Sequence, residues 1–356
     1  MTEPAQKPEE FISLTFHLQP GEKISGLCHR LATSMHERTA TLVHVLIYGR
    51  LTARAATMAA LRNAFGRLNF PTTWVEGAAC DDDPVAGIQV YAFTGDVERI
   101  EFCGRIVGSM FMAGGARQCL IGGLTPACTT LSRADQTTKV IEDLQVVLGR
   151  AGFDLADTVR TWFFLENILA WYDDFNPART KIYSGVKFRS GSAPASTGVG
   201  AKNPDGAALM LAAWAVRPLA SSTQAREVAS PLQCPAPAYN STFSRAMEIS
   251  SNSGRRLFIS GTASIAQGGK TMWIGDVRKQ IELTMDVVEA ILRSRGFTFT
   301  DLTRATAYFR HAADARYFAE WLAANPSVKI PVPAAQCDIC RDDLLFELEA
   351  DAETGN

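Results

Sequence analysis

The sequence contains little that would tie the protein to a membrane or to nucleic acid. No apolar run among its 356 residues reaches about 18 residues, the length that a membrane-spanning helix needs. Met1–Glu10 is polar and acidic, unlike a secretory signal peptide. The formal net charge of −2 provides no basic field for nucleic acid or for an anionic membrane. We therefore expect a cytoplasmic protein without nucleic-acid or membrane partners.

Motifs for metals and nucleotide cofactors are also missing. The five histidines are dispersed, and the sequence shows no phosphate-binding glycine loop, dinucleotide fingerprint or Ser-His-Asp order. Eight cysteines are scattered along the chain, which is typical of reduced thiols in a cytoplasmic protein. The pair Cys337-x-x-Cys340 could be a metal or redox half-site, but no second pair stands at zinc spacing. We expect neither metal nor cofactor.

An internal repeat is the most informative feature that is present. Gln136–Arg160 aligns without a gap with Gln280–Arg304, at an offset of 144 residues (280 minus 136). Both segments have apolar residues at helical spacing, end at a glycine (Gly152 or Gly296) and continue into an apolar run rich in β-formers. With a strand upstream, a second helix and a final strand, these elements form one repeated unit.

The repeat predicts three units in the chain. Residues 98–217 and 240–352 form two of them, separated by a proline-rich linker at 218–239. Residues 1–97 look like a third, partial copy, whose first helix we expect to be short or missing. Its strand, helix and strand are expected at Thr41–Tyr48, Thr52–Leu68 (with Thr52 as N-cap) and Ala86–Phe93.

The repeated motifs resemble those of the Rid (YjgF-like) superfamily. The shared features are a helix opening at Gln, Gly-Phe-x(3)-Asp-x-x-Arg, a Pro-Ala-small turn and a closing Glu-x-Glu strand. Rid proteins form trimers with ligand clefts between adjacent subunits. The resemblance implies an α+β fold of tandem Rid-like (chorismate-mutase-like) units, each a mixed sheet packed by two helices. It further implies a pseudo-trimer within one chain, present as a monomer or a homodimer.

The C-terminal half is also similar to the chorismatase branch, whose members hydrolyse chorismate or form hydroxybenzoate. The resemblance implies that Glu347 is the catalytic acid, and that Cys340 stands where hydroxybenzoate-forming members have cysteine. The matching segments are Phe243–Ala246, Phe258–Ile265, Gly275–Val277 and Cys337–Glu347, with Asp174–Arg179 and Pro194–Gly200 in the middle unit.

The strand around Glu347 supports that role on physical grounds. Strand alternation places Glu347 and Glu349 on one face, and a carboxyl among apolar neighbours can stay protonated near neutral pH. The alternative is two solvated glutamates on an open sheet face. The corresponding positions in the other units are expected to be Met210 and Gln89, so that one cleft of three keeps an acid.

Three arginines are candidates for binding a small carboxylated substrate. Guanidinium groups pair bidentately with carboxylates, and a dianion would need two of Arg341, Arg310 and Arg179. Each could instead be an ordinary surface or structural arginine. Thr262 and Ser264, at the end of a strand, could bind a substrate oxygen or simply form a turn.

Three functional hypotheses follow. The leading one is a chorismatase-like hydrolase or lyase in which Glu347 protonates an enolpyruvyl group and pyruvate is released. The second is a Rid-type enamine or imine deaminase, although Pro194-Ala-Ser196 and Pro333-Ala-Ala335 lack the arginine that such enzymes carry there. The third is a non-catalytic, small-molecule-binding Rid homologue.

Overall fold

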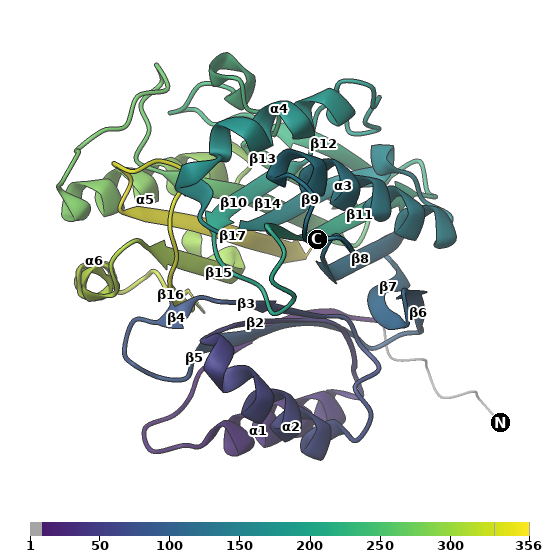
Figure 1. The fold of residues 1–356 in the computed structure, drawn as a ribbon. Helices are drawn as coiled ribbons and strands as arrows, with labels where there is room; N and C mark the ends of the chain where they lie inside the picture. Colours follow the sequence, from purple (N-terminus) through teal and green to yellow (C-terminus); the bar gives the residue numbers. More distant parts are fainter. Residues whose placement is uncertain (1–8, 331, 356) are drawn as a thin grey trace.

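Each of three successive parts of the chain packs two helices on one face of a β-sheet. The computed structural model describes residues 9–330 and 332–355 (Figure 1). Its sheets have four, six and seven strands, in the orders β1-β5-β2-β3, β10-β9-β11-β8-β7-β6 and β12-β13-β14-β17-β15-β16-β4. The predicted α+β class with two helices per unit is confirmed. No helix in these residues is long and apolar enough to cross a membrane.

The first unit is more complete than the sequence suggests. It comprises β1 (Phe11–Phe16), α1 (Ile24–Arg38), β2 (Thr41–Gly49), α2 (Arg54–Phe65), β3 (Thr72–Val75), β4 (Ala78–Ala79) and β5 (Val85–Phe93). Helix α1 has 15 residues, so the expectation of a short or missing first helix is wrong. This helix has no side-chain N-cap and contains Ser25 and Gly26. Its stability comes from packing of Leu27, Leu31 and Met35, which local propensity does not reveal.

Two further details of the expected boundaries differ. Thr52 lies inside a short 3-10 turn, and α2 has Ala53 at its N-cap without a side-chain hydrogen bond. From residue 9 onward, where the structure describes it, the first unit has no counterpart of the two antiparallel strands that begin each of the other units.

The second and third units share one order of elements. The second has β6 (Val97–Phe102), β7 (Arg105–Ala113), β8 (Ala116–Leu124), α3 (Arg133–Arg150), β9 (Thr158–Leu165), α4 (Tyr172–Tyr183), β10 (Ala195–Gly200) and β11 (Leu209–Pro218). The third has β12 (Gln224–Val228), β13 (Ala246–Ser251), β14 (Gly254–Ala263), α5 (Val277–Ser294), β15 (Leu302–Phe309), α6 (Ala315–Ala324), β16 (Ala334–Gln336) and β17 (Phe346–Gly355). The segment expected as a linker therefore contributes β12, which pairs with β13.

The repeat is visible in the way α3 and α5 end. Both helices have 18 residues, and each is followed by a glycine in the left-handed region, Gly152 at φ 74° and Gly296 at φ 72°. Glycine adopts this conformation without steric cost, which lets the chain turn back into β9 or β15.

The inner faces of the three sheets meet in one shared core, with the helices outside (Figure 1). Tyr48, Phe164 and Tyr308, one from each unit, lie together there. The hydroxyls of Tyr48 and Tyr308 are hydrogen-bonded at 2.8 Å, and the rings of Tyr48 and Phe164 pack edge to face. The three units therefore bury their sheets against one another, which brings residues from neighbouring units to common sites.

Candidate active site

A pocket of about 220 Å³ lies between the second and third units. It brings together four of the residues predicted from the sequence: Glu347, Cys340, Arg341 and Arg179. Helix α4 and strand β10 form its wall on the side of the second unit. Strands β14 and β17, with the segments that precede β13 and β17, supply the rest. The lining also includes Tyr172, Asn176, Ser196, Tyr239, Phe243, Arg245 and Gly261.

Glu347 is held in this pocket by its register in the sheet. On β17 it pairs with Tyr308 of β15 and Ala263 of β14, and its side chain is only 4% exposed. A Cβ atom at Gly261 would collide with the Glu347 carboxyl group, so the glycine makes the space that this carboxyl occupies. The pairing of β14 with β17 shifts register here, between Ile259 and Thr262.

The environment of Glu347 keeps its carboxyl protonated. Burial, reinforced by the nearby charge of Glu349, raises the pKa of Glu347 to about 8, although Arg160 and Arg245 oppose the shift. At pH 7 roughly nine molecules in ten therefore carry the proton. No other side chain among the described residues forms a hydrogen bond with this carboxyl.

Glu349, two residues along the same face, has the opposite state. Burial would raise its pKa, but Arg304 and Arg160 outweigh this and hold the pKa below its usual value. Its carboxylate oxygens lie 2.5 Å from Arg304 and 2.6 Å from Arg160. Strand β17 therefore presents one neutral acid to the pocket and one anion to the shared core.

Two buried arginines offer free hydrogen-bond donors at the pocket. Arg245 is 4% exposed and donates from Nε to the Cys234 carbonyl at 3.0 Å, but its Nη2 is buried without a partner in the described part of the chain. Arg179 is 2% exposed and donates to Asn176 at 2.8 Å, while its Nε is likewise unpaired. Unpaired buried donors are costly, and a carboxylate ligand would satisfy them.

Aromatic rings surround these guanidinium groups. Arg245 lies over Tyr239 and Phe243 at 5.3 and 5.5 Å, and Arg341 lies 5.5 Å from the Tyr239 ring. Arg341 also donates to the Gly269 carbonyl at 2.7 Å, which fixes the loop after β14. The pocket thus combines cations with apolar walls, a suitable environment for a carboxylated ring.

Cys340 lines the pocket as a neutral thiol. Burial, with a contribution from Glu347, raises the pKa of Cys340 to about 12, so it is neither a thiolate nucleophile nor a ready metal ligand. Burial also raises the pKa of Cys337, which packs in the shared core. Within residues 9–330 and 332–355, no group of three or more His, Cys, Asp or Glu could hold a metal ion.

Three of the predicted binding residues do not line the pocket. Arg310 donates to the Asp342 carbonyl and stabilises the loop before β17. Thr262 donates to the Ser260 carbonyl at 2.8 Å, and Ser264 donates to the Met272 carbonyl at 3.1 Å. On β14 it is Gly261 and Ala263 that reach the pocket, because alternate residues of a strand face opposite sides.

The sequence interpretation assigned no role to Arg245 or Tyr239. Arg245 lies in the Phe243–Ala246 motif, which was the available signal, and the adjacent Ser244 bridges to Ala195 of the second unit. Tyr239 falls in the segment expected as a linker. The positions of Arg245 and Tyr239 in the pocket depend on how the second and third units pack together, which no local sequence pattern reveals.

Strand register also corrects one expected correspondence. Glu347 pairs with Tyr308 as Met210 pairs with Phe164, so Met210 occupies the equivalent position. In the first unit Tyr48 pairs with Gly87, whereas Gln89 pairs with Leu46 and corresponds to Glu349. The prediction that Gln89 corresponds to Glu347 is therefore wrong by two residues. A shift of two residues keeps the side chain on the same face of the strand.

Known proteins resemble this chain in sequence and in fold. Residues 234–354 match the family model described as Endoribonuclease L-PSP. The chain is 28% identical over 240 residues to a chorismatase from Streptomyces hygroscopicus, a match that covers 61% of this chain and 67% of the relative. It is 26% identical over 224 residues to a 3-hydroxybenzoate synthase from the same organism, covering 55% and 64%.

The fold comparison extends over almost all of the chain. A crystal structure of a chorismatase superposes with a TM-score of 0.70 at 19% identity, covering 98% of this chain and 100% of that one. The resemblance predicted from the motifs is therefore confirmed: the C-terminal unit matches the endoribonuclease L-PSP (Rid) family, and the chain as a whole has the chorismatase fold.

Proposed function

We propose that this protein is a chorismatase-like enzyme that cleaves the enolpyruvyl group of chorismate, or of a related carboxylated enol ether, and releases pyruvate. The observation that carries the proposal is the protonated carboxyl of Glu347 in a pocket lined by Arg179, Arg245 and Arg341. The names of the two curated relatives and the shared fold support the same chemistry.

In the proposed reaction Glu347 acts as the general acid. Its proton passes to the methylene carbon of the enol ether, which leaves an oxocarbenium-like centre at the ether carbon and an anionic Glu347 beside it. Attack by water on that carbon gives a hemiketal, which collapses to pyruvate and a ring alcohol. A positioned acid contributes about 10²–10⁴-fold to such a step, and the adjacent negative charge stabilises the cation.

The arginines are proposed to bind and orient the substrate. The unpaired N–H groups of Arg245 and Arg179 would each donate a hydrogen bond to a carboxylate oxygen, and chorismate carries two carboxylates. Tyr239 and Phe243 would pack against its ring. Such pairing would hold the methylene carbon of the substrate close to the Glu347 carboxyl group, so that the binding energy favours proton transfer.

Cys340 is proposed to influence the product. In the resemblance to hydroxybenzoate-forming chorismatases a cysteine occupies this position, and here it is a neutral side chain close to Glu347. Forming hydroxybenzoate and pyruvate from chorismate consumes no net water, whereas forming the diol consumes one. A thiol that fills the pocket beside the ring would disfavour the entry of that water.

The test is to incubate the purified protein with chorismate and to follow pyruvate with a coupled dehydrogenase. We expect release by the natural protein, and a loss of about 10²–10⁴-fold in Glu347→Gln with the fold intact. Glu142→Gln, on an exposed part of α3, is the matched control and should be fully active. Equal rates in Glu347→Gln and the control would refute the role of Glu347.

Two other functions are separated by the same preparations. A Rid-type deaminase would release pyruvate from an amino-acid-derived iminopropionate, but Ser196 lines the pocket where those enzymes carry arginine. A non-catalytic binder would bind chorismate without turnover. It would lose binding in Arg341→Ala and be unaffected by Glu347→Gln.

A further inference from the structure

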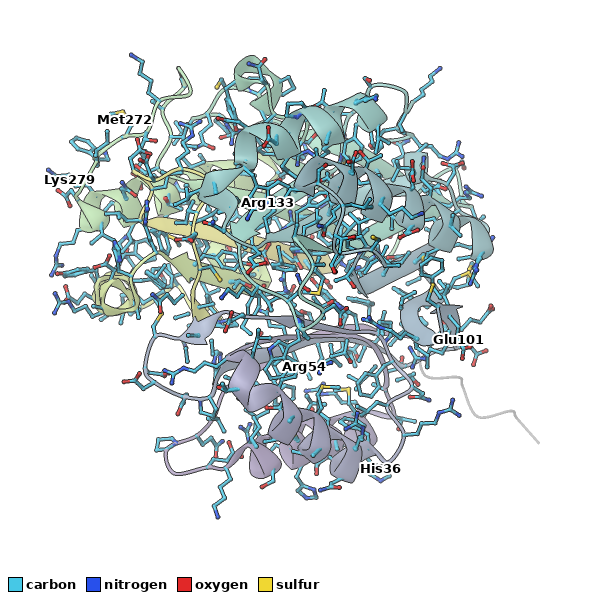
Figure 2. All side chains as sticks on the ribbon, in the orientation of Figure 1. His36, Arg54, Glu101, Arg133, Met272 and Lys279 are labelled. Carbon is cyan, nitrogen blue, oxygen red and sulfur yellow. The ribbon has the colours of Figure 1, made fainter. Side chains whose placement is uncertain are left out.

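A second pocket, of about 590 Å³, lies between the first and second units. We call it the α2 pocket, because Arg54 and Arg62 of α2 line it together with Arg67 and Arg105. Figure 2 labels Arg54 and Glu101, two of its lining residues, at the level where the first unit meets the second.

The α2 pocket corresponds to the candidate active site by strand register. Met210 takes the place of Glu347, and Thr72 of β3 takes the place of Ser196 of β10. Met210 is buried and carries no proton that it could give to a substrate. The α2 pocket therefore lacks the group on which cleavage is proposed to depend.

Positive charges outnumber negative charges at the α2 pocket. Four guanidinium groups face two carboxylates, those of Glu101 and Asp205, which leaves two positive charges (4 − 2). Asp205 is already engaged by Arg105 at 2.9 Å. The side chains of Arg54, Arg62 and Arg67 form no hydrogen bond or ion pair with the described part of the chain, and the charge of Arg54 contributes to lowering the pKa of Asp205. Guanidinium groups that outnumber the nearby carboxylates favour an anionic ligand.

Several other lining residues of the α2 pocket are apolar. Phe70, Trp74 and Met210 are buried at its base, and Met58 stands between Arg54 and Arg62 on the same face of α2. The indole N–H of Trp74 is buried without a hydrogen-bond partner among the described residues. An apolar base with one free donor and a cationic rim fits a ligand that has both a flat body and several negative charges.

We propose that the α2 pocket binds, without cleaving it, a small aromatic or apolar molecule that carries at least two carboxylate, phosphate or sulfonate groups. The observations behind this proposal are independent of chorismate cleavage. Binding here is therefore expected in Glu347→Gln as in the natural protein.

The test uses pyranine, a fluorescent pyrene with three sulfonates, titrated with the full-length protein at low salt and followed by anisotropy. We expect saturable binding that weakens at least tenfold in Arg54→Gln/Arg62→Gln. The matched control, Arg38→Gln/Arg293→Gln, removes two exposed arginines elsewhere and should change affinity less than twofold. Circular dichroism would show that both variants remain folded.

Three results would overturn the proposal. The first is no saturable binding of pyranine by the natural protein. The second is an equal loss of affinity in both double variants, which indicates nonspecific attraction. The third is a loss in Arg245→Gln and not in Arg54→Gln/Arg62→Gln, which would locate the probe in the candidate active site.

Discussion

Glu347 and Glu349 stand two residues apart on one face of β17, yet their environments give them opposite protonation states. The distance to the arginines explains the difference in protonation. Arg160 and Arg304 contact Glu349 directly, whereas Glu347 lies beyond hydrogen-bonding range of either. Pairs of carboxyl groups whose environments shift their pKa values in opposite directions are typical of acid catalysis. One glutamate can thus hold a proton for the substrate while the other anchors the core.

The pKa of Glu347 predicts how activity depends on pH. An acid with a pKa of about 8 donates its proton below that value, so pyruvate release should be constant near neutrality and fall as pH rises through about 8. The measurement is the pH profile of kcat/KM for chorismate, which reports pKa values of the free enzyme. A rate that keeps rising from pH 7 to about 9 would contradict an acid role for this group.

The same shift predicts a pH-dependent stability. Because the folded-state pKa of Glu347 is raised from 4.5, its contribution is fully present below about pH 4.5 and is lost as pH rises through about 8. Glu347→Gln removes this titration. The unfolding free energy of the variant, relative to that of the natural protein, should therefore increase by a few kcal/mol between about pH 5 and 9. Urea unfolding at both pH values measures the gain. Parallel pH dependences would contradict the buried-acid assignment.

Cys340 allows a prediction about product rather than rate. Cys340→Ala shortens a neutral side chain near Glu347 and makes room for water. We expect the ratio of diol to hydroxybenzoate to rise, with Cys340→Ser as a comparison that keeps an atom at the γ position. Separation of the products by chromatography provides the readout, and an unchanged ratio would show that the thiol does not control water.

At the scale of the element, the bulged end of β14 makes room for the acid. Gly261→Ala would place a methyl group against the Glu347 carboxyl, whereas nothing lies within 4 Å of the position that a methyl group would occupy at Gly198 on β10. We expect Gly261→Ala to lower pyruvate release by about 100-fold with a stability cost of about 1–3 kcal/mol. Gly198→Ala, in the same pocket, should match the natural protein in stability and lose less activity than Gly261→Ala. Similar activity in the two variants would show that β14 does not position Glu347.

The elements differ in how far the sequence predicts them. Helices α3 and α5 and strands β9 and β15 were identifiable, because a gap-free repeat and two left-handed glycines mark their boundaries. Helix α1 was missed, since its stability comes from tertiary packing around Leu31 rather than from capping. Strand β12 lies in a proline-rich stretch, and its extended conformation is stabilised by backbone pairing with β13.

The sequence likewise predicts some residues of the candidate site and not others. Alternation along β17 identified Glu347 because the glutamate and its neighbours lie in one strand. Thr262 and Ser264, at the end of β14 and just after it, do not line the pocket, because the pattern of small residues does not distinguish the two faces of the strand. Arg245 and Tyr239 needed knowledge of how the second unit approaches the third.

At the scale of the molecule, the shared core contains a buried ionic cluster. Arg160 and Arg304 both pair with Glu349, and Arg304 also approaches Asp351 at 3.5 Å. Glu349→Gln leaves two buried guanidinium groups underpaired, and we expect it to cost about 3–5 kcal/mol of unfolding free energy. Glu320→Gln, in an exposed pair on α6, should cost less than about 1 kcal/mol in the same urea titration. Equal costs would show that the cluster does not hold the units together.

The three unit interfaces have diverged from one another. The interface between the second and third units has Glu347, and the one between the first and second has Met210 and the arginines of the α2 pocket. At the corresponding position of the first unit is Gly87, where Pro333 of the third unit lies 3.1 Å from the place of a side chain. One proposed catalytic site per chain follows from this asymmetry.

The most direct test of the account is an infrared titration of Glu347 in the absence of substrate. The difference between the natural protein and Glu347→Gln should contain the band of a protonated carboxyl at about pH 6.5, and that band should disappear with a midpoint near pH 8. A carboxylate band already present at about pH 6 would show that Glu347 is ionised and cannot be the proton donor.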